Sequence, residues 1–261
     1  MNVLSEMLSY PFMVRALFGG MLVSLCASLL GVSLVLKRYS MIGDGLSHVS
    51  FGALSIALAM GWSPLKVSIP VVVLAAFFLL RITENSRIKS DAAIAMISAS
   101  SLAIGIIVTS LTTGMTTDVS SYMFGSILAM TKEDVVLSAV LCIIVLGLFV
   151  LCCNQVFAVT FDENFAKATG VNVGAYNMLI SVLTAVTIVL GMRMMGAMLI
   201  SSLIIFPALI AMRLQRSFSG VIIAAAITAV IDFLLGLVIS FLLSTPTGAS
   251  IVLVNLCVLL L

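Results

Sequence analysis

The sequence predicts an all-α integral membrane protein, a polytopic bundle of about nine transmembrane helices. Three observations predict this fold class: 62% of the 261 residues are hydrophobic, only 8% are charged, and long runs without charge recur along the chain. Soluble domains typically devote about a quarter of their residues to Asp, Glu, Lys and Arg. So few charges could not cover a water-facing surface, which excludes soluble and disordered chains, coiled coils, secreted disulfide scaffolds and nucleic-acid binders.

Each predicted helix is a run long enough to cross the hydrocarbon core, which takes roughly 17 to 25 residues. Charge-free runs of this length are Ala16–Leu36, Ala92–Leu111, Val135–Cys153, Tyr176–Met192 and Met194–Met212. Two more runs contain ionisable residues, Met41–Met60 and Gly220–Leu243. Two shorter runs complete the set, Val67–Leu80 and Ile251–Leu261, whereas the apolar patch Tyr122–Met130 is too brief to span. Residues 1–261 are therefore expected to form a single transmembrane domain.

The distribution of Lys and Arg predicts the orientation, because short cytoplasmic loops retain basic residues. With about nine crossings and an external N-terminus, the inner loops hold Lys37, Arg38, Arg81, Arg87, Lys89, Lys167, Arg213 and Arg216. The outer segments hold Arg15, Lys66, Lys132 and Arg193. This orientation places the longest polar connection, about residues 154–175, in the cytosol.

Asp44 and His48 are four residues apart inside a predicted span, and side chains at i and i+4 share one face of a helix. An ionisable residue at this depth is costly and usually faces the bundle interior or an aqueous path. A carboxylate oxygen with an imidazole nitrogen suits zinc, manganese or ferrous iron better than sodium or potassium. We expect the pair to contact a divalent metal ion.

Two ligands do not complete a zinc shell, but two copies of the chain about a two-fold axis would supply four. The spacing leaves an alternative open, in which Asp44 caps the helix and His48 makes a structural hydrogen bond to it. Asp232 lies near the middle of its own span and could contact an ion or join two helices. The second role is favoured, because no ligand-type residue accompanies Asp232 at i±3 or i±4.

The polar connection contains a predicted amphipathic helix of about two turns over Phe161–Thr169. Thr160 followed by Glu163 is a capping-box pattern, and Gly170 is a suitable stop. Three apolar residues fall on one side of this helix: Phe161, Phe165 and Ala168. The pattern leaves two ways to bury this apolar face open: it can dock on a soluble partner or pack against the chain's own helices.

Phosphate loops, nucleophile elbows and zinc-protease motifs do not occur in the sequence. We therefore expect a transport permease and not an enzyme, so that any ATP hydrolysis takes place on another polypeptide.

Several segments together resemble the membrane permease subunit of bacterial ABC importers for zinc, manganese or iron, over essentially the whole chain. They are LLGVSLVLKRYSMIGDGLSHVSFGALSIAL, SDAAIAM, the FGSIL of Phe124–Leu128, VTFDENFAKATGV, MRMMGAMLISSLIIFPALIAMR and STPTGASIVLVN. The most specific are GDGLSH and FDENFAKATG. Gly45 is a departure, since members of this family more often have Ala, and it is not expected to disturb ligation.

The resemblance implies a homodimer in the bacterial cytoplasmic membrane, with a fold related to vitamin B12 and siderophore import permeases. It implies that Asp44 and His48 contact the transported metal, zinc in preference to manganese or iron, with no permanent cofactor. It also implies partners: an extracytoplasmic metal-binding protein and two copies of a cytosolic ATP-binding subunit. The residues expected to couple to that subunit are Phe161, Asp162, Glu163, Phe165, Ala166 and Gly170.

Three rival functions stay open at this point. An ion-gradient-driven metal transporter or channel usually embeds more ionisable residues than this chain offers. A permease for a larger metal chelate would not be expected to need an Asp and His pair. A membrane scaffold would explain the hydrophobicity but not the ligand pair.

Overall fold

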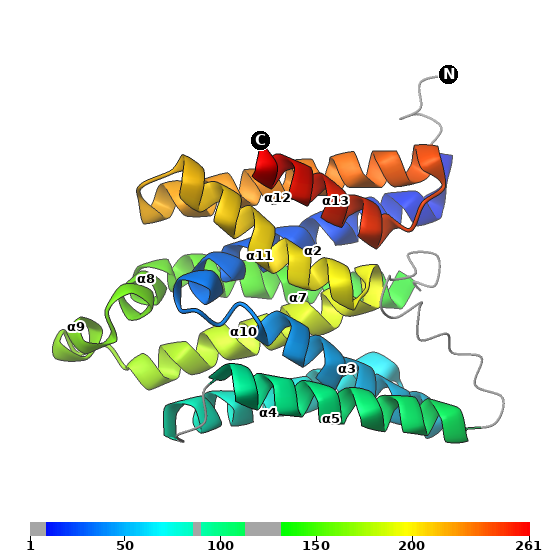
Figure 1. Cartoon of the computed structure of the whole chain (residues 1–261), viewed down its shortest axis with the longest axis horizontal. Coiled ribbons are helices and arrows are strands. Elements are labelled where there is room, and N and C mark those ends of the chain that lie inside the picture. The colour runs from blue at the N-terminus through cyan, green and yellow to red at the C-terminus, as the bar shows by residue number, and fades with distance from the viewer. Residues whose placement is uncertain (1–8, 86–89, 113–131) are drawn as a thin grey trace.

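The computed structural model describes residues 9–85, 90–112 and 132–261 of the chain, and in this part every regular element is a helix (Figure 1). The predicted all-α class is confirmed. The helices are α2 (Pro11–Leu36), α3 (Ile42–Ala59), α4 (Pro64–Asn85), α5 (Ser90–Leu111), α7 (Lys132–Leu151), α8 (Cys153–Phe161), α9 (Glu163–Ala168), α10 (Val173–Met195), α11 (Ala197–Leu214), α12 (Phe218–Leu243) and α13 (Thr247–Leu260). Arg87, Lys89, the patch Tyr122–Met130 and Phe124–Leu128 lie outside the described residues.

Six of the described helices are long and apolar enough to cross a membrane, and α7 with α8 would make a seventh if the 68° bend between them lies within one span. The two short predicted runs correspond to the shorter apolar helices Pro64–Leu79 and Thr247–Leu260. The polytopic membrane bundle is therefore confirmed, whereas the count of about nine crossings is not.

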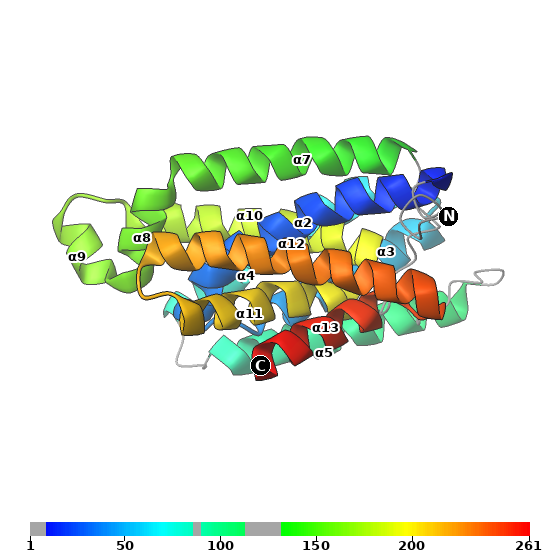
Figure 2. The same ribbon diagram turned by 90° about the horizontal axis from the view of Figure 1, so that it is seen from above.

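The helices differ in how much of their surface the bundle covers. In α2 and α3, 72% of the apolar window is buried, whereas in α5 only 17% is buried. Figure 2 shows α7 along one side of the bundle, and α5 and α13 along the opposite side. The outer face of α12 is a row of exposed residues at helical spacing: Ile223, Ile227, Ile231, Leu235 and Ile239. Lipid can cover such a face, because its hydrocarbon is as apolar as these side chains.

Helix α3 packs closely against α5 because small residues line the contact. A Cβ atom added at Gly52 would lie 2.7 Å from the carbonyl oxygen of Ser101. A Cβ atom at Gly45 would lie 2.5 Å from Cγ2 of Ile94. Gly45, noted above as a departure from the resembling family, therefore leaves room for an isoleucine of α5. Close backbone approach at small residues is a common way to join membrane helices.

Helices α8 and α9 lie beyond one end of the long helices, at the left of Figure 1. The helix ends that meet there include those of α2 and α11 and the starts of α10 and α12. Basic residues of the described part gather at this end: Lys37, Arg38, Arg81, Lys167, Arg213 and Arg216. Arg15, Lys66, Lys132 and Arg193 belong to the opposite ends of their helices. This division between the two ends agrees with the division that the sequence predicts.

Candidate metal site and coupling segment

Helix α3 begins directly after a tight turn from α2. Arg38 adopts a left-handed backbone conformation (φ 61°), and the N–H of Tyr39 donates to the carbonyl oxygen of Leu34 at 2.8 Å. These features end α2 and reverse the chain. Asp44 lies in the first turn of α3, and His48 lies one turn further on.

The Asp44 and His48 side chains lie on the same face of α3, with Nε2 of His48 3.7 Å from Oδ2 of Asp44. This distance is too long for a hydrogen bond. The N-cap of α3 is Met41, and no side-chain hydrogen bond caps this helix start. The structural alternative required a helix cap by Asp44 and a hydrogen bond between His48 and Asp44, and neither contact is formed. The side chain of Asp44 is 49% exposed and that of His48 is 20% exposed, so both can reach a ligand.

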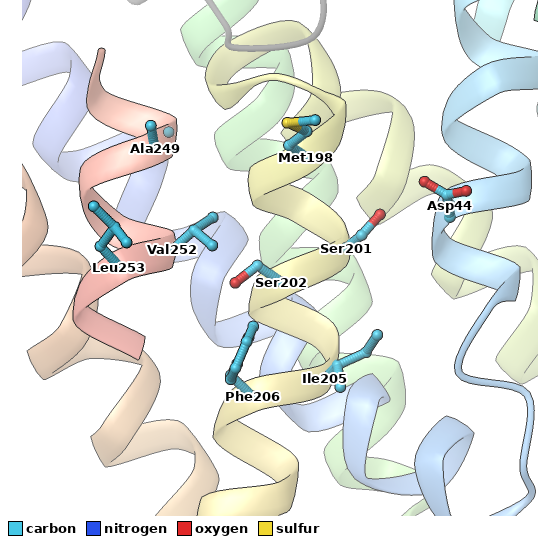
Figure 3. A pocket seen from close by; sticks show the side chains of 10 residues that line it. Asp44, Met198, Ser201, Ser202, Ile205, Phe206, Ala249, Val252 and Leu253 are labelled. Atoms are coloured by element: carbon cyan, nitrogen blue, oxygen red, sulfur yellow. The ribbon is translucent and has the colours of Figure 1, made fainter. Parts of the chain in front are cut away.

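Asp44 lines a cavity of about 580 Å³ between α3, α11 and α13. The other lining residues are Met198, Ser201, Ser202, Ile205, Phe206, Gly248, Ala249, Val252 and Leu253. In Figure 3 the carboxylate of Asp44 points across the cavity toward the side of α11 that carries Met198 and Ser201. Among the described residues that line this largely apolar, partly open cavity, Asp44 is the single carboxylate, an arrangement that would concentrate a cation there.

The contribution of α11 was missed by the sequence analysis. Ser202 is buried, and its Oγ has no hydrogen-bond partner within the described part of the chain. Ser201 donates from Oγ to the carbonyl oxygen of Ala197 at 3.2 Å and still lines the cavity. The available signal was a pair of hydroxyl residues inside an otherwise apolar span.

Asp232 does not lie beside Asp44 and His48. Its side chain is buried in α12, it does not line the cavity at Asp44, and its Oδ2 has no hydrogen-bond partner among the described residues. Within residues 9–85, 90–112 and 132–261, no three His, Cys, Asp or Glu side chains form a group that could hold a metal. One chain therefore offers two candidate ligands at this place, Asp44 and His48.

The predicted helix over Phe161–Thr169 is wrong in its start. Thr160 and Phe161 are the last residues of α8, and the chain is extended at Asp162 (φ −148°, ψ 99°) before α9 begins. The Oγ1 of Thr160 donates to the carbonyl oxygen of Val156 at 2.6 Å. Asp162 is the N-cap instead, because its Oδ1 accepts from the N–H groups of Asn164 and Phe165 at 2.9 and 3.0 Å.

The predicted stop at Gly170 is confirmed. Gly170 has φ 86°, and its N–H donates to the carbonyl oxygen of Lys167 at 3.1 Å. The N–H of Val171 donates to the carbonyl oxygen of Ala166 at 2.9 Å. These two hydrogen bonds form the Schellman motif, in which glycine adopts the left-handed conformation at least cost.

The two phenylalanines of this segment do not share a face, because they belong to different helices. The ring centroid of Phe161 lies 4.8 Å from that of Phe157 and 5.9 Å from that of Phe218, so Phe161 packs against the chain's own helices. Phe165 is 62% exposed. Ala166 is buried in a small cluster with Val159 and Val173. Phe161 is nonetheless 59% exposed, so both phenylalanines are available to a partner, whereas Ala166 is covered.

The profile of the ABC 3 transport family matches residues 9–261. A probable metal transport system membrane protein of Treponema pallidum is 33% identical over 264 residues, which are 98% of this chain and 96% of that protein. A high-affinity zinc uptake system membrane protein of Haemophilus influenzae is 27% identical, over 93% of each chain. A manganese transport system membrane protein of Listeria monocytogenes is 28% identical, over 97% of this chain and 90% of that protein.

Two solved structures are similar to the whole chain. PsaBC from Streptococcus pneumoniae in complex with Fab matches with a TM-score of 0.88 and 30% identity, over 99% of this chain and 93% of that chain. An inward-facing conformation of a putative metal-chelate type ABC transporter matches with a TM-score of 0.78 and 15% identity, over 94% and 83% of the two chains. The second match shows a shared fold alone.

Proposed function

The chain belongs to the ABC 3 transport family, and we propose that it is the permease subunit of an ATP-driven importer of a divalent transition-metal ion in the bacterial cytoplasmic membrane. The observation that carries this proposal is the position of Asp44 at the wall of the cavity between α3, α11 and α13, with His48 one turn away. A carboxylate and an imidazole inside a membrane helix are costly to keep without a ligand.

Zinc is the cargo that we favour. The oxygen and nitrogen ligands of Asp44 and His48 suit zinc, and the segment around α11 resembles zinc permeases. Relatives of similar identity are named for zinc and for manganese, and the same donor atoms bind both ions. Manganese and ferrous iron are therefore the alternatives that the experiment below compares with zinc.

The cargo site is proposed to form between two copies of the chain. One copy offers a carboxylate and an imidazole, whereas zinc in proteins commonly takes four ligands. A two-fold axis that brings two copies of α3 together would supply four ligands and two negative charges. Two carboxylates would balance the charge of a divalent ion in an apolar chamber.

We call the cytosolic connection at about residues 154–175, which contains most of α8 and all of α9, the coupling segment. It is proposed to bind the cytosolic ATP-binding subunit, so that each of two permease copies binds one such subunit. Helices α8 and α9 lie at the end of the bundle where the basic residues gather, which is the cytoplasmic end by the positive-inside rule. An extracytoplasmic binding protein would deliver the ion at the opposite end. ATP binding and hydrolysis would then rock the packed helices as rigid bodies, so that the cavity opens to each side in turn.

Reconstitution of the complex in liposomes tests this function. The complex should contain the purified permease, the ATP-binding subunit and the metal-binding protein. It should hydrolyse ATP and take up the added ion when zinc, manganese or ferrous iron is supplied, with the highest rates for zinc. Uptake driven by an ion gradient without ATP would instead support the rival class of transporter. A preparation that hydrolyses ATP but accumulates none of the three ions would contradict the proposal.

A further inference from the structure

A buried lysine joins the end of α2 to the coupling helix α9. Lys37 follows the last residue of α2, and its Nζ lies 2.9 Å from Oε1 of Glu163 at the start of α9. Lys37 also donates to Oδ1 of Asn177 in α10, and Nδ2 of Asn177 donates to the same Oε1 of Glu163 at 3.2 Å. The end of α2 therefore meets two consecutive helices, α9 and α10, in one polar cluster, although Lys37 is more than a hundred positions from both partners in the sequence.

This cluster differs from an ordinary surface ion pair. The side chain of Lys37 is only 8% exposed, whereas that of Glu163 is 47% exposed. Partial burial alone would raise the pKa of the Glu163 carboxyl, but hydrogen bonds from Lys37 and Asn177 and the charges of Lys37 and Lys167 outweigh burial and lower the pKa. Glu163 therefore stays ionised at neutral pH and holds the lysine ammonium group in place.

The position of Lys37 connects the coupling segment to the candidate metal site. Lys37 is directly followed by Arg38, whose left-handed conformation turns the chain from α2 toward α3. Asp44 is seven positions after Lys37 in the sequence, in the first turn of α3. A left-handed backbone is unfavourable for a residue with a side chain, so this turn is a place where a pull on Lys37 can change the path of the chain.

The ion pair is a direct connection between α9 and this turn. Otherwise α9 is attached through its neighbours in the sequence, α8 and α10, against which Ala166 packs in a cluster with Val159 and Val173. The contact between Lys37 and Glu163 instead spans 126 positions of the chain. This contact joins α9 to the turn at Arg38, which leads into α3.

We propose that Lys37 is a positioning residue for transport, held by Glu163 and Asn177, which transmits movement of α9 through the turn at Arg38 to Asp44. This inference rests on the proposed function, in which α9 carries the ATP-binding subunit and Asp44 contacts the cargo ion. The rival role for the cluster is a passive anchor that only stabilises α9. An anchor would change the amount of folded complex but not the number of ions moved for each ATP.

The test compares that ratio between variants of the reconstituted complex. Lys37→Met removes the charge with little change in length, and Glu163→Gln removes the charge of its partner while keeping the shape. Both variants should retain metal binding, and Lys37→Met, whose residue lies outside the segment proposed to bind the ATP-binding subunit, should also retain the co-purified subunit. The number of ions moved per ATP should fall at least about fivefold, which is the lower end of the effects found when two sites in a protein are coupled. The double variant Lys37→Glu with Glu163→Lys should recover a large part of the ratio.

Arg216→Met is the control, because it removes a cation near the same end of the bundle that is exposed, whereas Lys37 is buried. It should leave the ratio unchanged. If the wild-type complex transports metal and the ratio is unchanged in Lys37→Met and Glu163→Gln, the role of Lys37 is overturned, whereas the proposed function stands. A wild-type complex that transports none of the three ions overturns the proposed function, and the role of Lys37 with it.

Discussion

His48 lies one turn after Asp44 in α3, with its Nε2 3.7 Å from Oδ2 of Asp44, yet of the two only Asp44 lines the cavity toward α11. An ion in the cavity would therefore meet the carboxylate first. Mutation of a residue that only hydrogen-bonds to a metal ligand lowers metal affinity about 10- to 100-fold, and loss of a residue that contacts the ion itself should cost at least as much. We expect Asp44→Asn to weaken metal binding by at least about tenfold, with His48→Gln also weakening it, in equilibrium binding to the purified permease.

Asp91→Asn is the control for this prediction. Asp91 is also in the first turn of a helix, α5, and is exposed. Metal binding by this variant should match that of the wild type. Equal binding by the wild type and Asp44→Asn would remove Asp44 from the site.

The exposed ring of Phe165 should anchor the ATP-binding subunit. Truncation of an interface anchor costs more than about 1 kcal/mol, or about fivefold in affinity. Phe165→Asp should weaken co-purification of the subunit by at least that factor, while the permease still inserts, because Asp162 and Gly170 define α9 without this side chain. Leu214→Asp changes another exposed residue at the end of α11 and should not weaken it. Normal metal uptake by Phe165→Asp would contradict the docking role.

The carboxylate of Asp162 should keep α9 folded. It accepts hydrogen bonds from two backbone N–H groups, and loss of such a cap costs about 1 kcal/mol. In Asp162→Ala, hydrogen exchange at the amides of Asn164 and Phe165 should accelerate about fivefold. Asp162→Ser retains an acceptor and should exchange nearly as slowly as the wild type. Equal exchange in the alanine variant and the wild type would contradict this cap.

Gly52 should be essential for the packing of α3 on α5. A methyl group there would press against the backbone oxygen of Ser101, and overpacking typically costs about 1–3 kcal/mol. Gly52→Ala should lower the thermal unfolding midpoint of the purified permease. Gly147→Ala is the matched control, because a Cβ at Gly147 meets nothing within 4 Å. Equal midpoints for the two variants would show that the helices can separate at no cost.

The ion pair of Glu163 should be visible in its titration. Its pKa is lowered in the folded protein, so the stabilisation is fully present above the unfolded pKa of about 4.3 and is lost as the pH falls through the folded value. The carboxyl ¹³C signal of Glu163 should titrate below about pH 4.3. In Lys37→Met the midpoint should rise, since the main favourable partner is gone. A midpoint that does not change would mean that Lys37 does not hold this carboxylate.

Features that depend on near neighbours in the sequence were predicted well. The long helices follow from runs of apolar residues, and the shared face of Asp44 and His48 follows from the helical repeat alone. The stop at Gly170 was predicted because glycine is suited to the left-handed position after a helix. The start of α9 was predicted wrongly, since Thr160 and Asp162 are both good capping residues and the pattern does not decide between them.

Helix partners could not be predicted in the same way. A membrane helix that is apolar on every side carries little information about which neighbour it will meet, so the cavity of α3, α11 and α13 and the place of Ser202 were not foreseen. The separation of Asp232 from the Asp44 pair also depends on packing.

The sequence by itself determined that this chain is a helical membrane protein, with an acid and an imidazole one turn apart, because composition and helical repeat act locally. Only the tertiary structure decided that Asp44 faces a chamber and that Lys37 holds Glu163 and Asn177. Such contacts join residues more than a hundred positions apart, and they arise only when whole helices have packed.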